Sequence, residues 1–358
     1  MRSAAVVANL SILLTFILAA ILNSYDEHLY YLSVQEDGYV EWATFWGFVV
    51  AAWIFAVTAL HQLKVRRQLP WFMICLTMFC FFVAMEEISW GQRLLDYRAP
   101  EYFLEQNYQQ EFNLHNIAAT RIRKLVLQAI LLGYGVILSA TAQWAPAARL
   151  LKRCRIVVSP PSLIVGFLAM YVVYVWYPWS HTGEWVELAM AYGFAYVALF
   201  SRSPVAARSE AAGTVKALQV LAIIWALAAS TVIAVRYGHA ADPDNVNAAR
   251  FEIDALAKDF NSGHVRTRCN IHKRLFTFAR EYRQPYLFEG EYSQLLQDKG
   301  AGDRAEYLLD PWNSAYWIRH KCTRGRESRF IYSFGPDRRR DSTAWELGGD
   351  DIGAHLRE

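Results

Sequence analysis

The chain has 358 residues, of which 54% are hydrophobic and only 19% are charged, and its formal net charge is +3. A net charge this small gives no indication of nucleic-acid binding, and five cysteines in a chain of this length do not make a disulfide-rich scaffold. The length leaves room for two domains. The apolar residues are concentrated in long runs, which indicates helices that span a lipid bilayer.

About seven of these runs have the length that a spanning helix needs, roughly 20 mostly apolar residues. The first run could be a signal peptide, but no small-residue cleavage site closes it, so we interpret it as a retained helix. No run of this length follows the seventh. The expected spans cover residues 4–23, 42–63, 71–88, 125–144, 161–179, 184–200 and 217–235.

Lys and Arg residues predict how these spans are oriented, because cytoplasmic loops of membrane proteins are enriched in both. Basic residues follow the second and fourth expected spans and separate the sixth from the seventh, so these three loops alternate consistently. Arg121, Arg123 and Lys124 lie in a loop of the opposite set and count against this assignment. Most of the basic loops therefore predict a cytoplasmic N-terminus and a C-terminal domain on the opposite side of the membrane, which in a bacterial inner-membrane protein is the periplasmic side.

Polar segments interrupt the apolar pattern at three places, all expected at the outer face: the end of the third span, the loop that follows it, and the start of the sixth span. Ionisable groups at membrane depth are costly and usually functional. His and carboxylate side chains are suitable ligands for zinc or another divalent ion. The candidate catalytic residues are Glu86, Glu87, Arg93, Glu111, His115, His181 and Glu184.

Three interpretations of this polar set remain open: a metal or catalytic site, a structural network of ion pairs, and a ligand pocket without chemistry. Glu111 and His115 would share a helix face if their segment is helical. Glu184 would also complement the dipole at the start of a helix. The segments EEISWGQR (86–93) and NYQQEFNLHN (107–116) resemble those of uncharacterised bacterial multi-span membrane proteins, a resemblance that covers about 40–200 and implies no activity.

The composition changes after the seventh span and predicts a soluble domain. Asp242 and Pro243 are suitable residues for a helix start, and an apolar stripe then follows up to Gly263. A second helix is expected over 271–283. Two strands are expected over 315–322 and 329–334, joined by a hairpin turn at 323–327. The expected stripe consists of Val246, Phe251, Ile253, Leu256 and Phe260.

Three motifs in this domain, LDPWN (309–313), IYSFGPD (331–337) and GGDDI (348–352), resemble the globular domain of the major pseudopilin of type II secretion systems. The resemblance covers about 215–355. It implies an α+β fold and a calcium ion held by Ser333, Asp337, Asp350 and Asp351. Flexible loops that offer several oxygen ligands suit Ca²⁺. The alternative is that these acids are solvated loop residues that face the basic run 338–340.

The sequence departs from the pseudopilin family at the processing site. Pseudopilins are cleaved after a Gly that precedes Phe or Met, and a Glu occupies the fifth mature position. Here Gly213 precedes Thr214, the Glu is absent, and six expected spans replace the short basic leader. We therefore expect that this domain is not released as an ordinary filament subunit.

Cys269 and Cys322 both fall in the domain that we expect to be exported, where thiols tend to pair. We therefore predict a disulfide between them, with two buried free thiols as the alternative. Cys75 and Cys80 are expected to pack within the third span, and Cys154 is expected to be a free cytoplasmic thiol.

The sequence thus predicts an α-helical polytopic membrane protein with a C-terminal pseudopilin-like domain: a six-helix body (1–205), a seventh helix with its connection (206–240) and the soluble domain (241–358). One hypothesis is an envelope protein whose calcium-containing domain binds identical copies or pseudopilin-like partners. The other is a metal-dependent membrane enzyme that acts on a lipid or lipid-linked substrate, with Arg93 on the head group. Whether the chain is an enzyme at all stays open.

Overall fold

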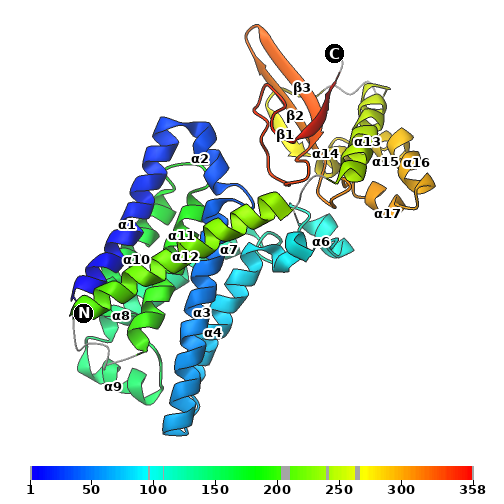
Figure 1. Cartoon of the computed structure of the whole chain (residues 1–358). Coiled ribbons are helices and arrows are strands. Elements are labelled where there is room, and N and C mark those ends of the chain that lie inside the picture. The colour runs from blue at the N-terminus through cyan, green and yellow to red at the C-terminus, as the bar shows by residue number, and fades with distance from the viewer. Residues whose placement is uncertain are drawn as a thin grey trace. The chain divides into compact units, whose positions relative to one another are not determined.

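The computed structural model describes residues 2–95, 97–107, 109–202, 210–238, 242–262 and 267–356 (Figure 1). The chain forms two compact units. The helical unit comprises Met1–Trp90 and Ala118–Val232, and the mixed unit comprises Gly91–Ile117 and Ile233–Glu358. The segment that follows the third expected span therefore belongs to the same compact unit as the C-terminal domain.

The helical unit contains only helices among its described residues. Its helix η2 is a π-helix, a conformation that is rare in proteins. The last helix, α12, continues into the first residues of the mixed unit. In chain order the elements are α1 (Arg2–Tyr25), α2 (Glu27–Val34), α3 (Tyr39–Arg66), α4 (Trp71–Glu87), α7 (Thr120–Gln128), η2 (Ala129–Leu138), α8 (Ser139–Thr141), α9 (Ala145–Arg153), η3 (Pro161–Leu163), α10 (Ile164–Trp176), α11 (Thr182–Ser201) and α12 (Glu210–Gly238).

Among the described residues, four helical segments are long and apolar enough to cross a membrane, which identifies the chain as a multi-pass membrane protein. The expectation of about seven spans is wrong. Helix α4 has 17 residues, a length of about 26 Å against a hydrocarbon core of about 30 Å. Helix α10 has only 13 residues. The four segments are Ser3–Tyr25, Glu27–Val65, Thr120–Thr141 and Ala211–Val235.

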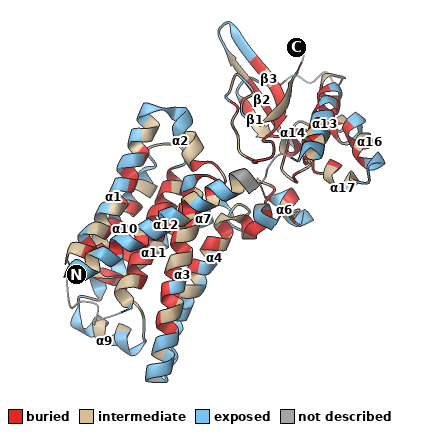
Figure 2. Cartoon of the chain, viewed as in Figure 1, coloured by how far each residue is buried: buried red, intermediate tan, exposed pale blue. Residues whose placement is uncertain are grey.

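Helix α11 is long enough to cross a membrane but less apolar than the four segments. It carries Glu184 and Glu187 in its first two turns. All residues from Trp185 to Ala198 except Glu187 are nevertheless buried (Figure 2). It packs against α3, α1 and α10. At the α3 contact, a Cβ atom on Gly47 would lie 2.8 Å from the Ala191 Cβ, so the two helices approach closely there. A helix enclosed in this way does not need the apolar surface that a lipid-exposed helix requires.

The mixed unit combines short helices with an antiparallel sheet in the order β1-β2-β3-β4. The sheet order equals the chain order, so neighbouring strands are also consecutive. The elements are η1 (Ser89–Gly91), α5 (Gln92–Leu95), α6 (Glu101–Gln106), α13 (Pro243–Ser262), β1 (Ile271–Arg274), α14 (Leu275–Glu281), α15 (Tyr286–Glu289), α16 (Glu291–Asp298), α17 (Gly302–Ala305), β2 (Trp317–Thr323), β3 (Arg326–Ser333) and β4 (Ile352–His355).

The predicted hairpin is confirmed: β2 and β3 pair up to Thr323 opposite Arg326, and Gly325 in the turn has φ +81°. The expected helix over 271–283 is wrong in its first four residues, which form β1 and pair with β2. Helix α14 accounts for the rest of that helix prediction up to Glu281. Strand β4 was not predicted, because its four residues carry too short a pattern to identify a strand.

The two faces of the sheet are covered differently. Ile318 and Ile331 are cross-strand partners on the face that packs against the helices. Phe330 and Tyr332 lie on the other face with Trp317 and Leu347. This division follows from the alternation of side chains along a strand. The second face is therefore covered by the chain that connects β3 to β4.

Helix α13 supplies a buried face to the helix-side core, as its sequence predicted. Ile253, Leu256 and Phe260 are buried there, and the Asp242 carboxylate accepts a hydrogen bond from the backbone of Asp244 (3.0 Å). The expected stripe was wrong at Phe251, which is 65% exposed. At 100° per residue, Phe251 points about 140° to 180° away from the three buried positions.

The segment Gly91–Ile117 is an integral part of the mixed unit. Leu104 is 1% exposed and belongs to the same apolar core as the helices that follow α12. Arg98 forms an ion pair with Asp303 (2.6 Å), and its guanidinium lies 5.0 Å from the centre of the Tyr307 ring. Phe103 packs edge-on against Phe112 within the segment. The 115 residues from Ala118 to Val232 separate the two segments that form this unit.

Candidate functional site

Three carboxylates converge in the connection between β3 and β4, residues 334–351, which we call the acidic loop. Oxygen atoms of Asp337, Asp341 and Asp350 all lie within 4.8 Å of one another. Asp337 is buried, Asp341 is half-buried and Asp350 is exposed. Like charges at this distance repel one another unless a proton or a cation compensates them. Carboxylate oxygens on a flexible loop are the ligands that Ca²⁺ prefers.

Two glycines allow the acidic loop to bring these carboxylates together. Gly335 has φ +69° and Gly349 has φ +62°, a backbone conformation that glycine adopts without strain. A Cβ atom on Gly335 would overlap the backbone carbonyl of Asp350, and one on Gly349 would overlap the Asp341 carboxylate. The loop is also tied at Asp337, whose backbone N–H donates to Asp350 Oδ2 (3.3 Å).

Two of the four predicted calcium ligands make other contacts in this structure. Ser333 Oγ donates to Asp310 Oδ2 (2.5 Å), and Asp351 Oδ2 accepts a hydrogen bond from the backbone N–H of Ser342 (2.7 Å). Asp337 and Asp350 were predicted and do converge. Asp341 joins them although the sequence analysis did not select it. Its only sequence signal is its position directly after the basic run 338–340.

Asp310 connects the first of the three motifs to this region. It is fully buried and accepts hydrogen bonds from the backbone N–H groups of Trp312 (3.0 Å) and Ser314 (2.8 Å) as well as from Ser333. Burial raises the pKa of Asp310 to about 6, although each of these hydrogen bonds opposes the shift. The motif at 309–313 therefore holds the end of β3, where the acidic loop begins.

The electrostatics of the acidic loop favour a cation. Burial, and then the nearby charge of Asp350, raise the pKa of Asp337 to about 7, with a smaller contribution from Asp341. Arg339 opposes this shift without cancelling it. Burial likewise raises the pKa of Asp351 to about 7, although hydrogen bonds from Ser342 oppose the shift. Without a cation, these carboxyl groups are therefore partly protonated at neutral pH, and a bound divalent ion would favour their ionised forms.

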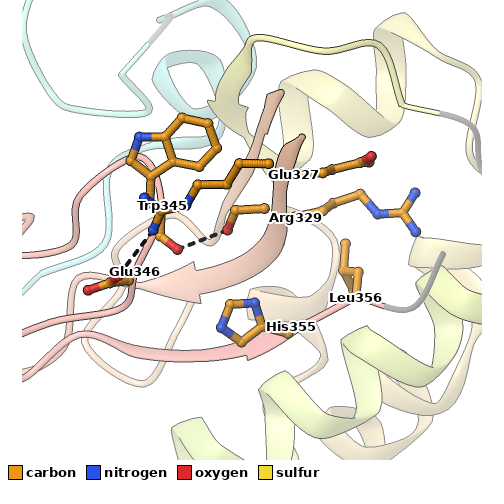
Figure 3. Close-up of a pocket in the computed structure, with 8 residues that line it drawn as sticks. Glu327, Arg329, Trp345, Glu346, His355 and Leu356 are labelled. Carbon is orange, nitrogen blue, oxygen red and sulfur yellow. Dashed lines mark hydrogen bonds and ion pairs between the residues drawn. The ribbon is translucent and has the colours of Figure 1, made fainter. Parts of the chain in front are cut away.

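Contacts with β3 hold the far part of the acidic loop on the sheet and border a cavity of about 450 Å³ (Figure 3). The Arg326 guanidinium lies 4.6 Å from the centre of the Trp345 ring and forms an ion pair with Glu346 (3.1 Å). Ser328 Oγ donates to the Trp345 carbonyl (3.1 Å). Figure 3 shows Glu327 pointing away from Trp345, as alternation along β3 requires.

A second cavity of about 570 Å³ lies between helix α13 and the acidic loop. Val246 and Ile253 give it an apolar wall, while Asp350 and Asp351 place carboxylates on the opposite side. Arg250 and Asp254 add charge from the helix. This cavity, which we call the groove, therefore shares Asp350 with the carboxylate cluster. The remaining lining residues are Pro336, Leu347, Gly349, Ile352 and Gly353.

In the helical unit, the structure brings together three of the predicted polar residues and adds two others. Glu87, at the end of α4, lies within electrostatic range of Glu86, Glu184, Glu187 and Glu41. Glu184 and Glu187 come from the first turns of α11, and Glu41 comes from the first turn of α3. Helix α3 packs against both α4 and α11. Sequence analysis did not select Glu41 and Glu187, because only the packing of α3 against α4 and α11 brings them close to Glu87.

Glu86 makes a further contact at the end of α4, and the remaining predicted residues of the polar set have different surroundings. His181 precedes α11 with φ 56°, and its ring lies edge-on to Tyr31 at 6.0 Å. Glu86 accepts a hydrogen bond from Trp90 Nε1 (2.7 Å). Arg93, Glu111 and His115 belong to the mixed unit, and the Arg93 side chain lies outside the described residues.

The segment that contains Glu111 and His115 is not helical, so the spacing of these two residues does not place them on one helix face. Asn107 Nδ2 donates to the Glu111 carbonyl (2.6 Å) and to Asn113 Oδ1 (2.8 Å), which makes the segment a hydrogen-bonded turn.

No protein-family model, curated protein or solved structure matches the chain. The pseudopilin resemblance therefore depends on the three sequence motifs.

Proposed function

We propose that the mixed unit is a calcium-binding interaction domain and that the helical unit anchors it in the bacterial inner membrane. The observation that supports this most directly is the convergence of Asp337, Asp341 and Asp350 on a loop whose glycines permit it. The resemblance to the major pseudopilin supports the same proposal from sequence. Its natural partners would be a second copy of this chain or a pseudopilin-like protein.

The disulfide supports a periplasmic position for this domain, and the shared core requires its two segments to lie on one side of the membrane. The Cys269–Cys322 disulfide, as predicted from sequence, is present, and disulfides persist in oxidising compartments such as the periplasm. The segments Gly91–Ile117 and Ile233–Glu358 form one compact unit, so both must lie on the same side of the bilayer. A buried core that both segments share could not form across a membrane. Because four candidate spans separate the N-terminus from the C-terminal domain, a periplasmic domain implies a periplasmic N-terminus, in place of the cytoplasmic N-terminus that we expected from the loop charges.

Calcium would act on the interaction surface through the acidic loop. The loop joins the last two strands and lines the groove beside helix α13. A cation held by Asp337, Asp341 and Asp350 would fix Asp350 and the backbone at Gly349, and both residues line that groove. Binding of a partner in the groove would then depend on calcium, because the order of the loop sets the shape of the groove.

Calcium titration of the full-length chain in detergent tests the proposal. We expect one Ca²⁺ per chain, with a Kd between about 10⁻⁶ and 10⁻³ M, and an Asp341→Asn variant that binds at least tenfold more weakly. Asp298→Asn, an exposed acid on α16, is the matched control and should bind like the wild type. Cross-linking of copies with and without Ca²⁺ then tests assembly. The absence of calcium binding, or equal binding by Asp341→Asn, would contradict the proposal.

The cluster around Glu87 supports a second candidate, a metal-dependent enzyme of the membrane that acts on a lipid or lipid-linked substrate. Glu41, Glu184 and Glu187 supply further carboxylates near Glu87, and His181 remains a predicted participant. Metal analysis distinguishes the candidates. Zinc or manganese that is retained by Asp341→Asn and lost from Glu87→Gln favours the enzyme, whereas calcium that is lost only from Asp341→Asn favours the interaction domain.

A further inference from the structure

The disulfide closes the end of the ladder between β1 and β2 that lies next to the β2–β3 turn. Ile271 pairs with His320 in that ladder, so Cys269 and Cys322, each two residues further on, face one another with Cα atoms 5.4 Å apart. Cys269 is exposed and Cys322 is half-buried. Cys269 is therefore the more accessible residue of this disulfide.

A buried histidine lies directly against the Cys322 sulfur. His320 is 4% exposed, and its Nε2 atom lies 3.0 Å from Cys322 Sγ and 2.8 Å from Glu327 Oε1. Its other ring nitrogen, Nδ1, lies 2.6 Å from Thr267 Oγ1. His320 and Cys322 share a face because they are two residues apart on a strand, and Glu327 is the cross-strand partner of Cys322.

These contacts determine where the imidazole carries its hydrogen. The Glu327 carboxylate can only accept a hydrogen bond when it is ionised, so Nε2 is the protonated nitrogen. Nδ1 then accepts from the Thr267 hydroxyl. The Nε2–H group is thus held between a carboxylate and Cys322 Sγ. A disulfide that only cross-links two strands needs no such donor beside one of its sulfurs.

We propose that Cys269–Cys322 is a thiol-exchange site for a dithiol reductant, with His320 as its catalytic residue. An incoming thiolate attacks Sγ of the exposed Cys269 and forms a mixed disulfide there. The Cys269–Cys322 bond breaks, and its electron pair remains on Cys322 Sγ as a thiolate, which the His320 Nε2–H stabilises by a hydrogen bond. Exchange is faster when the departing thiolate is better stabilised and the attacked sulfur is accessible.

The second thiol of the reductant completes the reaction. As a thiolate it attacks the mixed disulfide, forms the internal disulfide of the reductant and releases Cys269 as a thiolate. Both cysteine thiolates take up protons from solvent. The reductant loses two electrons and the protein disulfide gains them, so the reaction also runs in reverse with an oxidised dithiol.

The rate of reduction by dithiothreitol tests the role of His320. The full-length oxidised chain, with Cys75, Cys80 and Cys154 replaced by Ser, is treated with dithiothreitol in detergent, and new thiols are then counted over time. We expect His320→Leu to slow reduction by about tenfold or more, and His320→Gln, which keeps an N–H donor, to retain part of the rate. His355→Leu, an exposed histidine on β4, is the control and should leave the rate unchanged.

The site of attack is tested in the wild-type chain, so that this result does not depend on whether a variant folds. A brief reaction with the monothiol glutathione, followed by alkylation and peptide mass mapping, should place glutathione on Cys269 and the alkyl group on Cys322. Glutathione on Cys322 would overturn the proposal. So would folded His320→Leu protein that is reduced as fast as the wild type. If His320→Leu does not fold, the rate of His320→Gln decides, and a rate equal to that of the wild type together with equal labelling of both cysteines would overturn it.

Discussion

Asp337 links calcium binding to pH because its carboxyl group titrates near neutrality. Burial, together with Asp350 and Asp341, raises the pKa of Asp337 to about 7. Below that pH a proton must leave before the ionised carboxylate can hold the cation. We therefore expect the Kd for Ca²⁺ to be about tenfold higher at pH 6 than at pH 8. Calorimetric titration at both pH values measures this, and an unchanged Kd would contradict the assigned role of Asp337.

The same carboxyl groups predict how stability depends on pH when calcium is removed. Asp337 and Asp351 have pKa values of about 7 in the folded chain, above the ordinary value of about 3.9 for an unfolded Asp. Between about pH 4 and pH 7 the folded state therefore binds more protons than the unfolded state, and the free energy of unfolding falls as pH rises.

Denaturant unfolding in the presence of a chelator, followed by tryptophan fluorescence, should show this fall between pH 5 and pH 8. Saturating Ca²⁺ should reduce it, because the cation favours the ionised folded form. The Asp337→Asn variant should show a shallower dependence on pH. The buried His272, whose pKa is lowered to about 2, contributes in the opposite direction, so the comparison of variants decides: an identical pH dependence for Asp337→Asn and the wild type would show that Asp337 is not held as described.

At the scale of elements, the acidic loop depends on glycine at two positions, and Gly349 gives the sharper test. A Cβ atom there would overlap the Asp341 carboxylate. We expect Gly349→Ala to weaken Ca²⁺ binding at least as much as Asp341→Asn does, as measured by the same titration. Gly325 also has a positive φ, in the β2–β3 turn, but a Cβ atom there would contact nothing within 4 Å. Gly325→Ala is therefore the matched control and should bind Ca²⁺ normally.

Helix α6 provides a second test, because it lies far in sequence from the core that it completes. Leu104 is 1% exposed in that core, whereas Tyr102 on the same helix is 60% exposed. We expect Leu104→Ala to lower the free energy of unfolding of the mixed unit by about 2–5 kcal/mol, and Tyr102→Ala to change it by less than about 1 kcal/mol. Denaturant unfolding measures both. Equal effects would show that α6 does not belong to this core.

Elements with strong local signals were predictable from the sequence. Asp242 and Pro243 start helix α13, and Gly325 lies in a hairpin turn between two strands, so both features were expected. Strands β1 and β4 were not expected, because four residues carry little pattern and pairing with a neighbouring strand decides their conformation. Asp341 was missed for a related reason: only the folded loop brings it to Asp337 and Asp350.

The number of spans was overestimated because an apolar run does not show how long its helix is, as α4 and α10 illustrate, nor whether the helix faces lipid or is enclosed by other helices. Helix α11 is the clearest case, since its neighbours α3, α1 and α10 cover it. That the segment Gly91–Ile117 belongs to the mixed unit could not be predicted from the sequence either. Its contacts, such as that of Arg98 with Asp303, join positions about 200 residues apart, and no local sequence pattern predicts such contacts.

At the scale of the whole molecule, the shared core of the mixed unit makes a prediction about sidedness. Residues 102 and 299 are both exposed and belong to one compact unit, although the sequence between them contains two candidate spans. We expect Tyr102→Cys and Lys299→Cys, each in a chain whose Cys75, Cys80 and Cys154 are replaced by Ser, to react with a membrane-impermeant maleimide in intact spheroplasts. Labelling after lysis provides the total for each variant.

The two variants must behave alike if the unit is as described, whichever side it occupies. Labelling of both would place the unit in the periplasm, an oxidising compartment in which the Cys269–Cys322 disulfide is stable. Protection of both until lysis would place the unit in the cytoplasm and would remove the oxidising environment on which the periplasmic assignment depends. Labelling of only one would contradict the shared core itself, because a bilayer cannot pass between Leu104 and the apolar residues that it contacts.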